Sequence, residues 1–164
     1  MFSSAVPLAA FALLLAAVST PAPLPEQPPS RVKVMFDQMR NGKYQQEAFN
    51  FPKLEWSDIP ALLDRAESTT ELKTFPTNPI SSFHIPTRPE GVVALWLVEG
   101  VRKGGKYPSL NPRIHPAGDT AEERATNHKA LAAAYKGWWA KVKQLPPEKA
   151  RDVNPLEGTK LLWQ

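Results

Sequence analysis

The sequence contains no cysteine. This absence excludes disulfides, zinc–cysteine sites, iron–sulfur clusters, thiol nucleophiles and a lipid-bearing N-terminal cysteine. The sequence also lacks a Gly-rich phosphate-binding loop, the Gly-x-Ser-x-Gly turn of serine hydrolases and an Asn-x-Ser/Thr glycosylation site. No apolar run reaches the ~18 residues that a membrane-spanning helix needs, so we expect no membrane span.

The charge balance is only weakly positive. The 164 residues include 20 Lys+Arg and 16 Asp+Glu, which gives a net charge of +4. So small an excess argues against a nucleic-acid partner and leaves attraction to acidic polymers or anionic surfaces as an alternative. Proline is abundant: its 18 copies are roughly twice the average usage.

The N-terminus predicts export. Residues 5–18 form a charge-free apolar run, followed by small residues at Ala17 and Ser19. This pattern is typical of a secretory signal peptide over residues 1–19, cleaved near Ser19, although no Lys or Arg precedes the run. We therefore expect an exported protein, periplasmic or secreted. The alternative is an apolar N-terminal helix that stays in the fold.

Residues 20–30 hold five prolines and predict a stiff linker. A docking motif for an aromatic groove is the alternative.

The spacing of apolar residues predicts four helices, over residues 31–41, 58–66, 91–103 and 121–144. Thr120 and Glu123 fit a capping box at the start of the longest one, whose apolar stripe runs to Leu145. The unbroken apolar run 92–98 also fits a buried strand, but its helix-forming residues favour a helix. Pro146 and Pro147 are expected to end this longest helix.

The remaining segments are expected to be ordered but irregular. Prolines interrupt residues 67–90 and 107–118, and the apolar tail 154–164 is expected to fold back over the helices. The prediction is a mainly α single domain over residues 31–164, a small bundle of about four helices with long Pro-rich loops. The two helix pairs also fit a divergent helical repeat.

Several stretches resemble an uncharacterised family of exported bacterial proteins of unknown function. They are FPTNPISSF at 75–83, ALWLVEGVRKG at 94–104, YPSLNP at 107–112, NPLEGT at 154–159, WSDIPALL at 56–63 and the Tyr135…Trp138-Trp139 pattern. The resemblance covers about residues 31–164. It implies a signal-bearing, mostly helical domain and no catalytic residues.

Polar residues in the first irregular segment are candidate binding residues. Asn78, Ser81 and Ser82 are expected to cap turns, and a binding role is the alternative. A nucleophile–base pair with the nearby His84 lacks any third, orienting group.

Glu99 and Arg102 lie three residues apart on the apolar third helix. A buried charge needs a partner, so we expect an ion pair that fastens the 75–83 loop to this helix. The alternative is that Arg102, with Asn78 nearby, receives an anionic group.

Trp138 continues the apolar stripe of the last helix, whereas Trp139 lies off it and is a candidate for stacking on a sugar or peptide. Packing in the core or under the tail is the alternative.

Histidines and carboxylates give no strong metal or catalytic pattern. His128 lies on the apolar stripe and is expected to be a half-buried, hydrogen-bonded residue. His115, Asp119, Glu122 and Glu123 are expected to form an ordinary capping region, so no metal or other cofactor is predicted.

The leading functional hypothesis is a non-catalytic, monomeric module that binds an extracytoplasmic ligand or protein. Its surface would comprise loops 67–90 and 104–118 together with Trp139. The alternatives are a small hydrolase or lyase that uses Glu99 or His128 as general acid/base, and a structural envelope protein.

Overall fold

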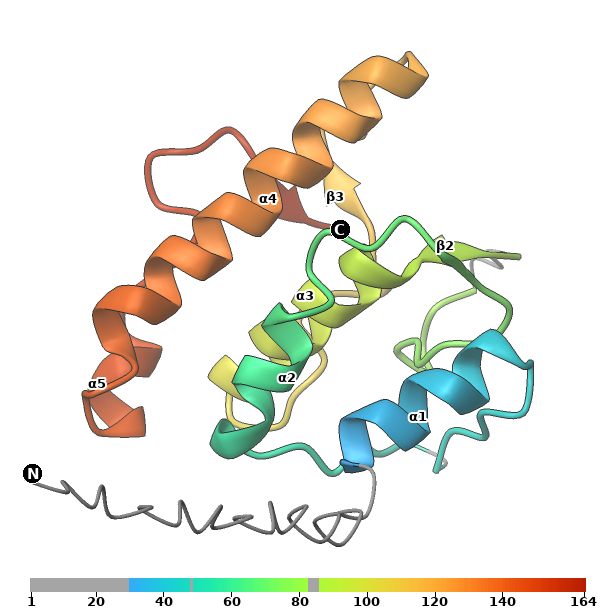
Figure 1. Cartoon of the computed structure of the whole chain (residues 1–164), viewed down its shortest axis with the longest axis horizontal. Helices are drawn as coiled ribbons and strands as arrows, with labels where there is room; N and C mark the ends of the chain where they lie inside the picture. Colours follow the sequence, from blue (N-terminus) through green and yellow to red (C-terminus); the bar gives the residue numbers. More distant parts are fainter. Residues whose placement is uncertain (1–29, 48, 83–85) are drawn as a thin grey trace, which may run out of the picture.

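The computed structural model describes residues 30–47, 49–82 and 86–164 (Figure 1). The predicted signal peptide, the linker up to residue 29 and His84 lie outside the described residues. The described part is mainly helical, as predicted; its helices are α1 (Arg31–Arg40), α2 (Ile59–Leu63), α3 (Glu90–Arg102), α4 (Ala121–Val142) and α5 (Pro147–Arg151). The four-helix bundle and the repeat-like arrangement stay predictions.

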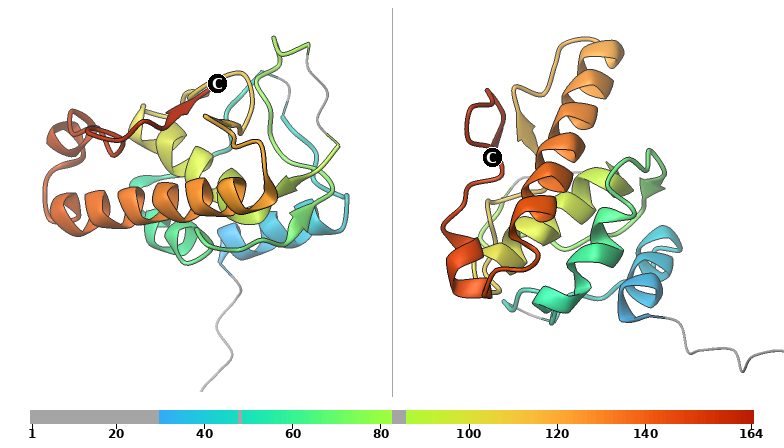
Figure 2. Two further views of the ribbon diagram at one scale, coloured as in Figure 1. Left: turned by 90° about the horizontal axis from the view of Figure 1, so that it is seen from above. Right: turned by 60° about the vertical axis from the view of Figure 1, so that its left-hand side comes forward.

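Helix α3 forms the centre of the core. Its residues from Glu90 to Val101 are all buried, and α2, α4 and α5 pack against it (Figure 2). A helix that is apolar on every side must be covered on every side. The strand alternative for residues 92–98 is therefore wrong.

Helix α4 begins at the predicted capping box. The Thr120 hydroxyl accepts a hydrogen bond from the Glu123 amide, and the Glu123 carboxylate accepts one from the Thr120 amide, both at 3.1 Å. The buried side of the helix includes Leu131, Tyr135 and Trp138. Leu145, which we expected to continue this stripe, is 41% exposed because the helix ends at Val142.

A short helix that we did not predict follows α4. Helix α5 begins at Pro147, a proline being tolerated in the first turn because its missing N–H needs no partner there. Ala150 is fully buried, and α5 packs on α3. The two prolines thus follow the end of α4, as predicted, and the second of them begins a further helix.

Two small antiparallel sheets interrupt the segments expected to be irregular. Strand β1 (Glu71–Leu72) pairs with β2 (Arg88–Pro89), and β3 (Ile114–His115) pairs with β4 (Leu162–Trp163). The second pair folds the tail back as predicted. Trp163 donates from its indole to the Tyr135 hydroxyl at 2.8 Å.

A buried carboxylate connects the first three helices. Glu90, only 1% exposed, accepts hydrogen bonds from Arg40 at 2.7 and 3.0 Å, from Arg65 at 2.8 Å and from the Ser68 hydroxyl at 3.2 Å. Burial raises the pKa of Glu90, but the hydrogen bonds from Arg40 and Arg65 outweigh burial, so the pKa lies below its ordinary value. The carboxylate is therefore ionised at neutral pH.

We expect Glu90→Gln to lower the free energy of unfolding at pH 7 by about 3 kcal/mol, because it leaves two guanidinium groups without their buried counter-charge. A lowered folded-state pKa stabilises the fold above the ordinary carboxyl pKa. The difference between wild type and variant should shrink as the pH falls through that range toward the lowered pKa. Urea unfolding from pH 7 to pH 3 measures it.

Glu148→Gln provides the control, since Glu148 is an exposed residue of α5. We expect its unfolding free energy to follow wild type across the same pH range. Equal curves for both variants would contradict the role given to Glu90.

Candidate functional site

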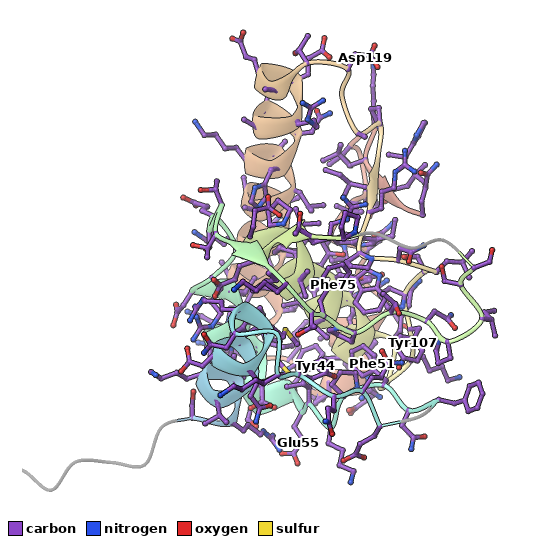
Figure 3. The ribbon with its side chains drawn as sticks, turned by 90° about the vertical axis from the view of Figure 1, so that its right-hand side faces the viewer. Tyr44, Phe51, Glu55, Phe75, Tyr107 and Asp119 are labelled. Carbon is purple, nitrogen blue, oxygen red and sulfur yellow. The ribbon has the colours of Figure 1, made fainter. Side chains whose placement is uncertain are left out.

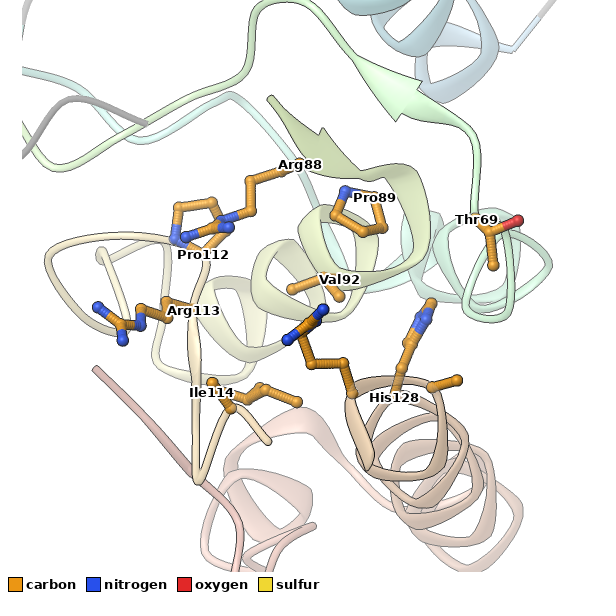
Figure 4. Close-up of a pocket in the computed structure, with 11 residues that line it drawn as sticks. Thr69, Arg88, Pro89, Val92, Pro112, Arg113, Ile114 and His128 are labelled. Atoms are coloured by element: carbon orange, nitrogen blue, oxygen red, sulfur yellow. The ribbon is translucent and has the colours of Figure 1, made fainter. Parts of the chain in front are cut away.

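A cavity of about 250 Å³ opens between the two irregular segments and the start of α4 (Figure 4). We call it the arginine pocket. Its lining residues come from five parts of the chain: Thr69; Arg88, Pro89 and Val92; Pro112, Arg113 and Ile114; Ala117; and Arg124, Ala125 and His128.

Apolar side chains form the walls of the arginine pocket. Val92 comes from the first turns of α3, and Ile114 comes from β3. The pairing of β3 with β4 holds Ile114 in place, since Ile114 lies opposite Trp163. Val92 and Ile114 are each 7% exposed, so both are almost covered in the fold.

Three arginines lie around these walls. Among the described residues, neither Arg88, Arg113 nor Arg124 forms an ion pair. Four arginines elsewhere do pair with carboxylates: Arg31, Arg40, Arg65 and Arg102. The pocket therefore gathers three guanidinium groups that form no ion pair with the described residues, although Glu71 and Glu123 act on Arg88 and Arg124 from a greater distance.

Arg88 is the least satisfied of the three. Its Nε is buried and has no hydrogen-bond partner among the described residues. Burial lowers the pKa of Arg88, and repulsion from Arg113 lowers it further, while Glu71 on the paired strand acts in the opposite direction. The Arg88 guanidinium nevertheless remains charged at neutral pH, because arginine loses its proton only at far higher pH.

The backbone that precedes α4 accepts hydrogen bonds from the Arg124 side chain. Its guanidinium donates to the carbonyl oxygens of Asp119 at 2.9 Å and Gly118 at 3.4 Å. These contacts fix the side chain without cancelling its charge.

His128 lines the pocket and reaches into the core. Its Nε2 lies 2.8 Å from the carbonyl oxygen of Ala66. A carbonyl oxygen only accepts, so Nε2 bears a hydrogen and donates it to Ala66. The prediction of a hydrogen-bonded histidine is confirmed, and at 9% exposure His128 is more buried than the half-burial that we expected.

The predicted binding residues lie elsewhere. Asn78 caps its own turn, accepting from the Ile80 amide at 3.3 Å, and its amide donates to the Leu110 carbonyl at 3.1 Å. The Ser81 hydroxyl lies 3.1 Å from the Asn111 side-chain oxygen, and Ser82 is exposed. Turn capping is confirmed for Asn78, and these contacts join the two irregular segments.

Glu99 and Arg102 form the expected ion pair, with two hydrogen bonds of 2.7 and 2.8 Å. Contrary to our expectation, the pair forms no hydrogen bond with residues 75–82, the described part of the 75–83 loop. Arg102 donates to the Arg151 carbonyl of α5, and Glu99 accepts from the Tyr135 hydroxyl of α4 at 2.9 Å. Burial, and then the charge of Glu99, raises the pKa of Tyr135, which keeps this hydroxyl a donor.

Trp139 is half-buried, with its ring centroid 5.5 Å from that of Trp56 and 5.9 Å from that of Trp138. The tail residue Trp163 packs on Tyr135 instead. Trp139 lines a separate open depression with Pro60, Leu63, Asp64, Lys136, Ala140 and Lys143. Its binding role stays a prediction, as do those of the other five candidates: Asn78, Ser81, Ser82, Glu99 and Arg102.

Sequence reasoning missed the three arginines. Arg88 precedes Pro89 and Arg113 follows Pro112, so the one available signal was a basic residue beside a proline in an ordered loop. Arg88 and Arg113 are brought together by two strand pairings. Strands of two residues are too short to be predicted from the spacing of apolar residues.

Histidines and carboxylates gather nowhere for a metal ion in the part of the chain that the structure describes. The predicted capping role of the 115–123 segment is confirmed, since Glu123 also accepts from the Asp119 amide at 2.7 Å. Within the same described ranges, no helix is long and apolar enough to cross a membrane.

A family model described as Domain of unknown function (DUF4943) matches residues 26–164. The chain belongs to this family. The resemblance to an uncharacterised family is thereby confirmed, and the family's domain includes every residue of the arginine pocket. The comparisons of this DUF4943 chain with curated proteins and with solved structures found no match.

Gly91 lets His128 approach Ala66 behind the pocket. A Cβ added at Gly91 would clash with the Ala66 carbonyl oxygen and lie 2.5 Å from His128 Nε2. We expect Gly91→Ala to destabilise the fold by about 1–3 kcal/mol, because this tightly packed place must widen. Thermal and urea unfolding measure the loss.

Gly137→Ala in α4 is the matched control, because its added Cβ meets nothing within 4 Å. There the same substitution should stabilise the fold by up to about 1 kcal/mol, since alanine restricts the unfolded chain. If Gly91→Ala raises the free energy of unfolding as Gly137→Ala does, the close approach at Gly91 is contradicted.

Proposed function

We propose that this DUF4943 domain is a non-catalytic binding module that holds a small anionic ligand with an apolar group in the arginine pocket. One observation carries the proposal: three arginines without ion-pair partners, among the described residues, surround a cavity with apolar walls. The proposal narrows the unknown ligand expected from the sequence to one chemical class.

The need for an anion follows from the charge of the pocket. A half-buried guanidinium beside another guanidinium is costly, and an anion between Arg88 and Arg113 would relieve both burial and repulsion. A carboxylate or phosphate oxygen also matches the planar donors of arginine, with which it forms strong charge-assisted hydrogen bonds.

The need for an apolar group follows from the walls. Ligand sites combine mainly apolar linings with a few placed polar groups. Val92, Ile114 and the two prolines provide the apolar surface, while the arginines fix the orientation of the ligand.

The position of the pocket favours binding over catalysis. Glu99 is bound by Arg102 and Tyr135 and lies away from the lining residues. His128 does line the pocket, but its Nε2 donates to Ala66. No residue triad that would activate a nucleophile is formed by these groups.

We also propose that the protein is exported. The apolar run 5–18 and the small residues at 17 and 19 support this proposal. Expression in a bacterium followed by N-terminal sequencing of the extracytoplasmic fraction should give a chain that begins at Thr20. An intact Met1 in the cytosol would contradict it.

Binding of a small branched carboxylate tests the pocket. We expect isovalerate to bind the wild-type protein and isovaleramide, which lacks the charge, to bind at least tenfold more weakly by isothermal titration calorimetry. Arg113→Gln should also weaken isovalerate binding about tenfold or more, since it removes a charged hydrogen-bond donor. Arg113 is exposed, so the variant should fold normally.

Lys149→Gln on α5 is the control, because it removes the same charge from an exposed position outside the lining residues. Its affinity for isovalerate should match wild type. A wild-type protein that binds neither isovalerate nor other small carboxylates and phosphates would favour the structural alternative.

A further inference from the structure

The arginine pocket opens beside a second, larger hollow of about 950 Å³. Arg113 and Ala117 line both, so the two spaces are neighbours. We call the second space the acidic hollow; its lining comprises Arg113, His115, Pro116, Ala117, Gly118, Asp119, Thr120, Glu122, Glu123, Thr126 and Asn127. Figure 3 places Asp119 at the end of the molecule remote from Tyr44 and Glu55.

The two spaces differ in the charge of their linings, although they share Arg113. Three carboxylates line the acidic hollow, from Asp119, Glu122 and Glu123. Hydrogen bonds from the amides of Thr120 and Asp119 hold the pKa of Glu123 below its ordinary range, so this group is ionised at neutral pH. A molecule that occupies both spaces meets arginines at one end and carboxylates at the other.

The arrangement of arginines at one end and carboxylates at the other disfavours several classes of anionic ligand. A nucleic acid, a polyphosphate or an acidic polysaccharide would bring further negative charge toward Asp119, Glu122 and Glu123. A long acyl chain needs more apolar room than the arginine pocket gives, since its 250 Å³ is below the ~300–1,000 Å³ of typical ligand sites. The continuation of the space is polar, so an acyl chain finds no apolar exit there.

We propose that the ligand is the free carboxyl terminus of a peptide with an apolar last residue. The inference rests on the proposed function and specifies its ligand. The terminal carboxylate lies between Arg88 and Arg113, and the last side chain packs on Val92 and Ile114. The preceding residues pass Ala117 into the acidic hollow, where a basic side chain is favoured.

Each part of this ligand meets a matching group. The carboxylate supplies a negative charge between Arg88 and Arg113, and a single apolar side chain fits the small apolar space. The peptide backbone needs hydrogen-bond partners, which Thr126 and His115 in the acidic hollow supply. Capture of a carboxyl terminus is a recurrent mode of peptide recognition.

A set of acetylated tripeptides tests the inference on the full mature chain by calorimetry. We expect Ac-Lys-Ala-Leu with a free carboxylate to bind at least tenfold more tightly than its C-terminal amide and than isovalerate. Replacing the lysine of the peptide by glutamate should weaken binding at least threefold.

Glu122→Gln isolates the contribution of the acidic hollow, because Glu122 is exposed and is not part of the capping box. In this variant the preference for the lysine peptide over the glutamate peptide should fall toward one, with isovalerate affinity within twofold of wild type. Glu148→Gln, which lies outside both spaces, should leave the preference unchanged.

The outcomes separate the two proposals. If isovalerate binds as tightly as the tripeptide, or the amide binds as tightly as the acid, the peptide inference fails. Isovalerate binding that depends on Arg113 would still leave the anion-binding function standing. If neither carboxylates nor phosphates bind the wild type, the proposed function itself fails.

Discussion

A buried ion pair network holds the molecule together at the start of its central helix. Glu90 accepts hydrogen bonds from Arg40 of α1 and from Arg65 and Ser68 after α2, so one carboxylate ties three helices to one point. The next residue, Gly91, admits His128 of α4 to the same region. The turn from β2 into α3 therefore fixes both the core and the back of the arginine pocket.

The helices could be predicted because their signals are local. The Thr120–Glu123 capping box and the apolar run 92–98 are contained within single segments, and the structure places helices at both. The strands β1 to β4 could not be predicted, because two-residue strands have no periodicity and depend on a partner up to 49 positions away, as Ile114 and Trp163 do. Helix α5 was not predicted, because a pair of prolines is typical of the end of a helix. A proline is also tolerated in the first turn of a new helix, and this second role applies to Pro147.

The candidate site was less predictable than the fold. The sequence singled out Glu99 and Arg102 as a pair, correctly, but the attachment of that pair to α5 required knowledge of packing. The sequence pattern does not indicate that Arg88 and Arg113 belong to a site. What distinguishes them is that, among the described residues, they form no ion pair with a carboxylate. Such a lack is a property of three-dimensional neighbours and leaves no trace in residue spacing.

The arginine pocket is made from chain segments that lie as far apart as Thr69 and His128. A molecule seated there touches both irregular segments, the first turns of α3 and the first turns of α4, and so braces them against one another. Since only the folded chain offers these surfaces together, occupancy adds its own free energy to that of folding. Resistance to heat and to proteases would then rise with ligand concentration, making the fold itself a gauge of how full the pocket is.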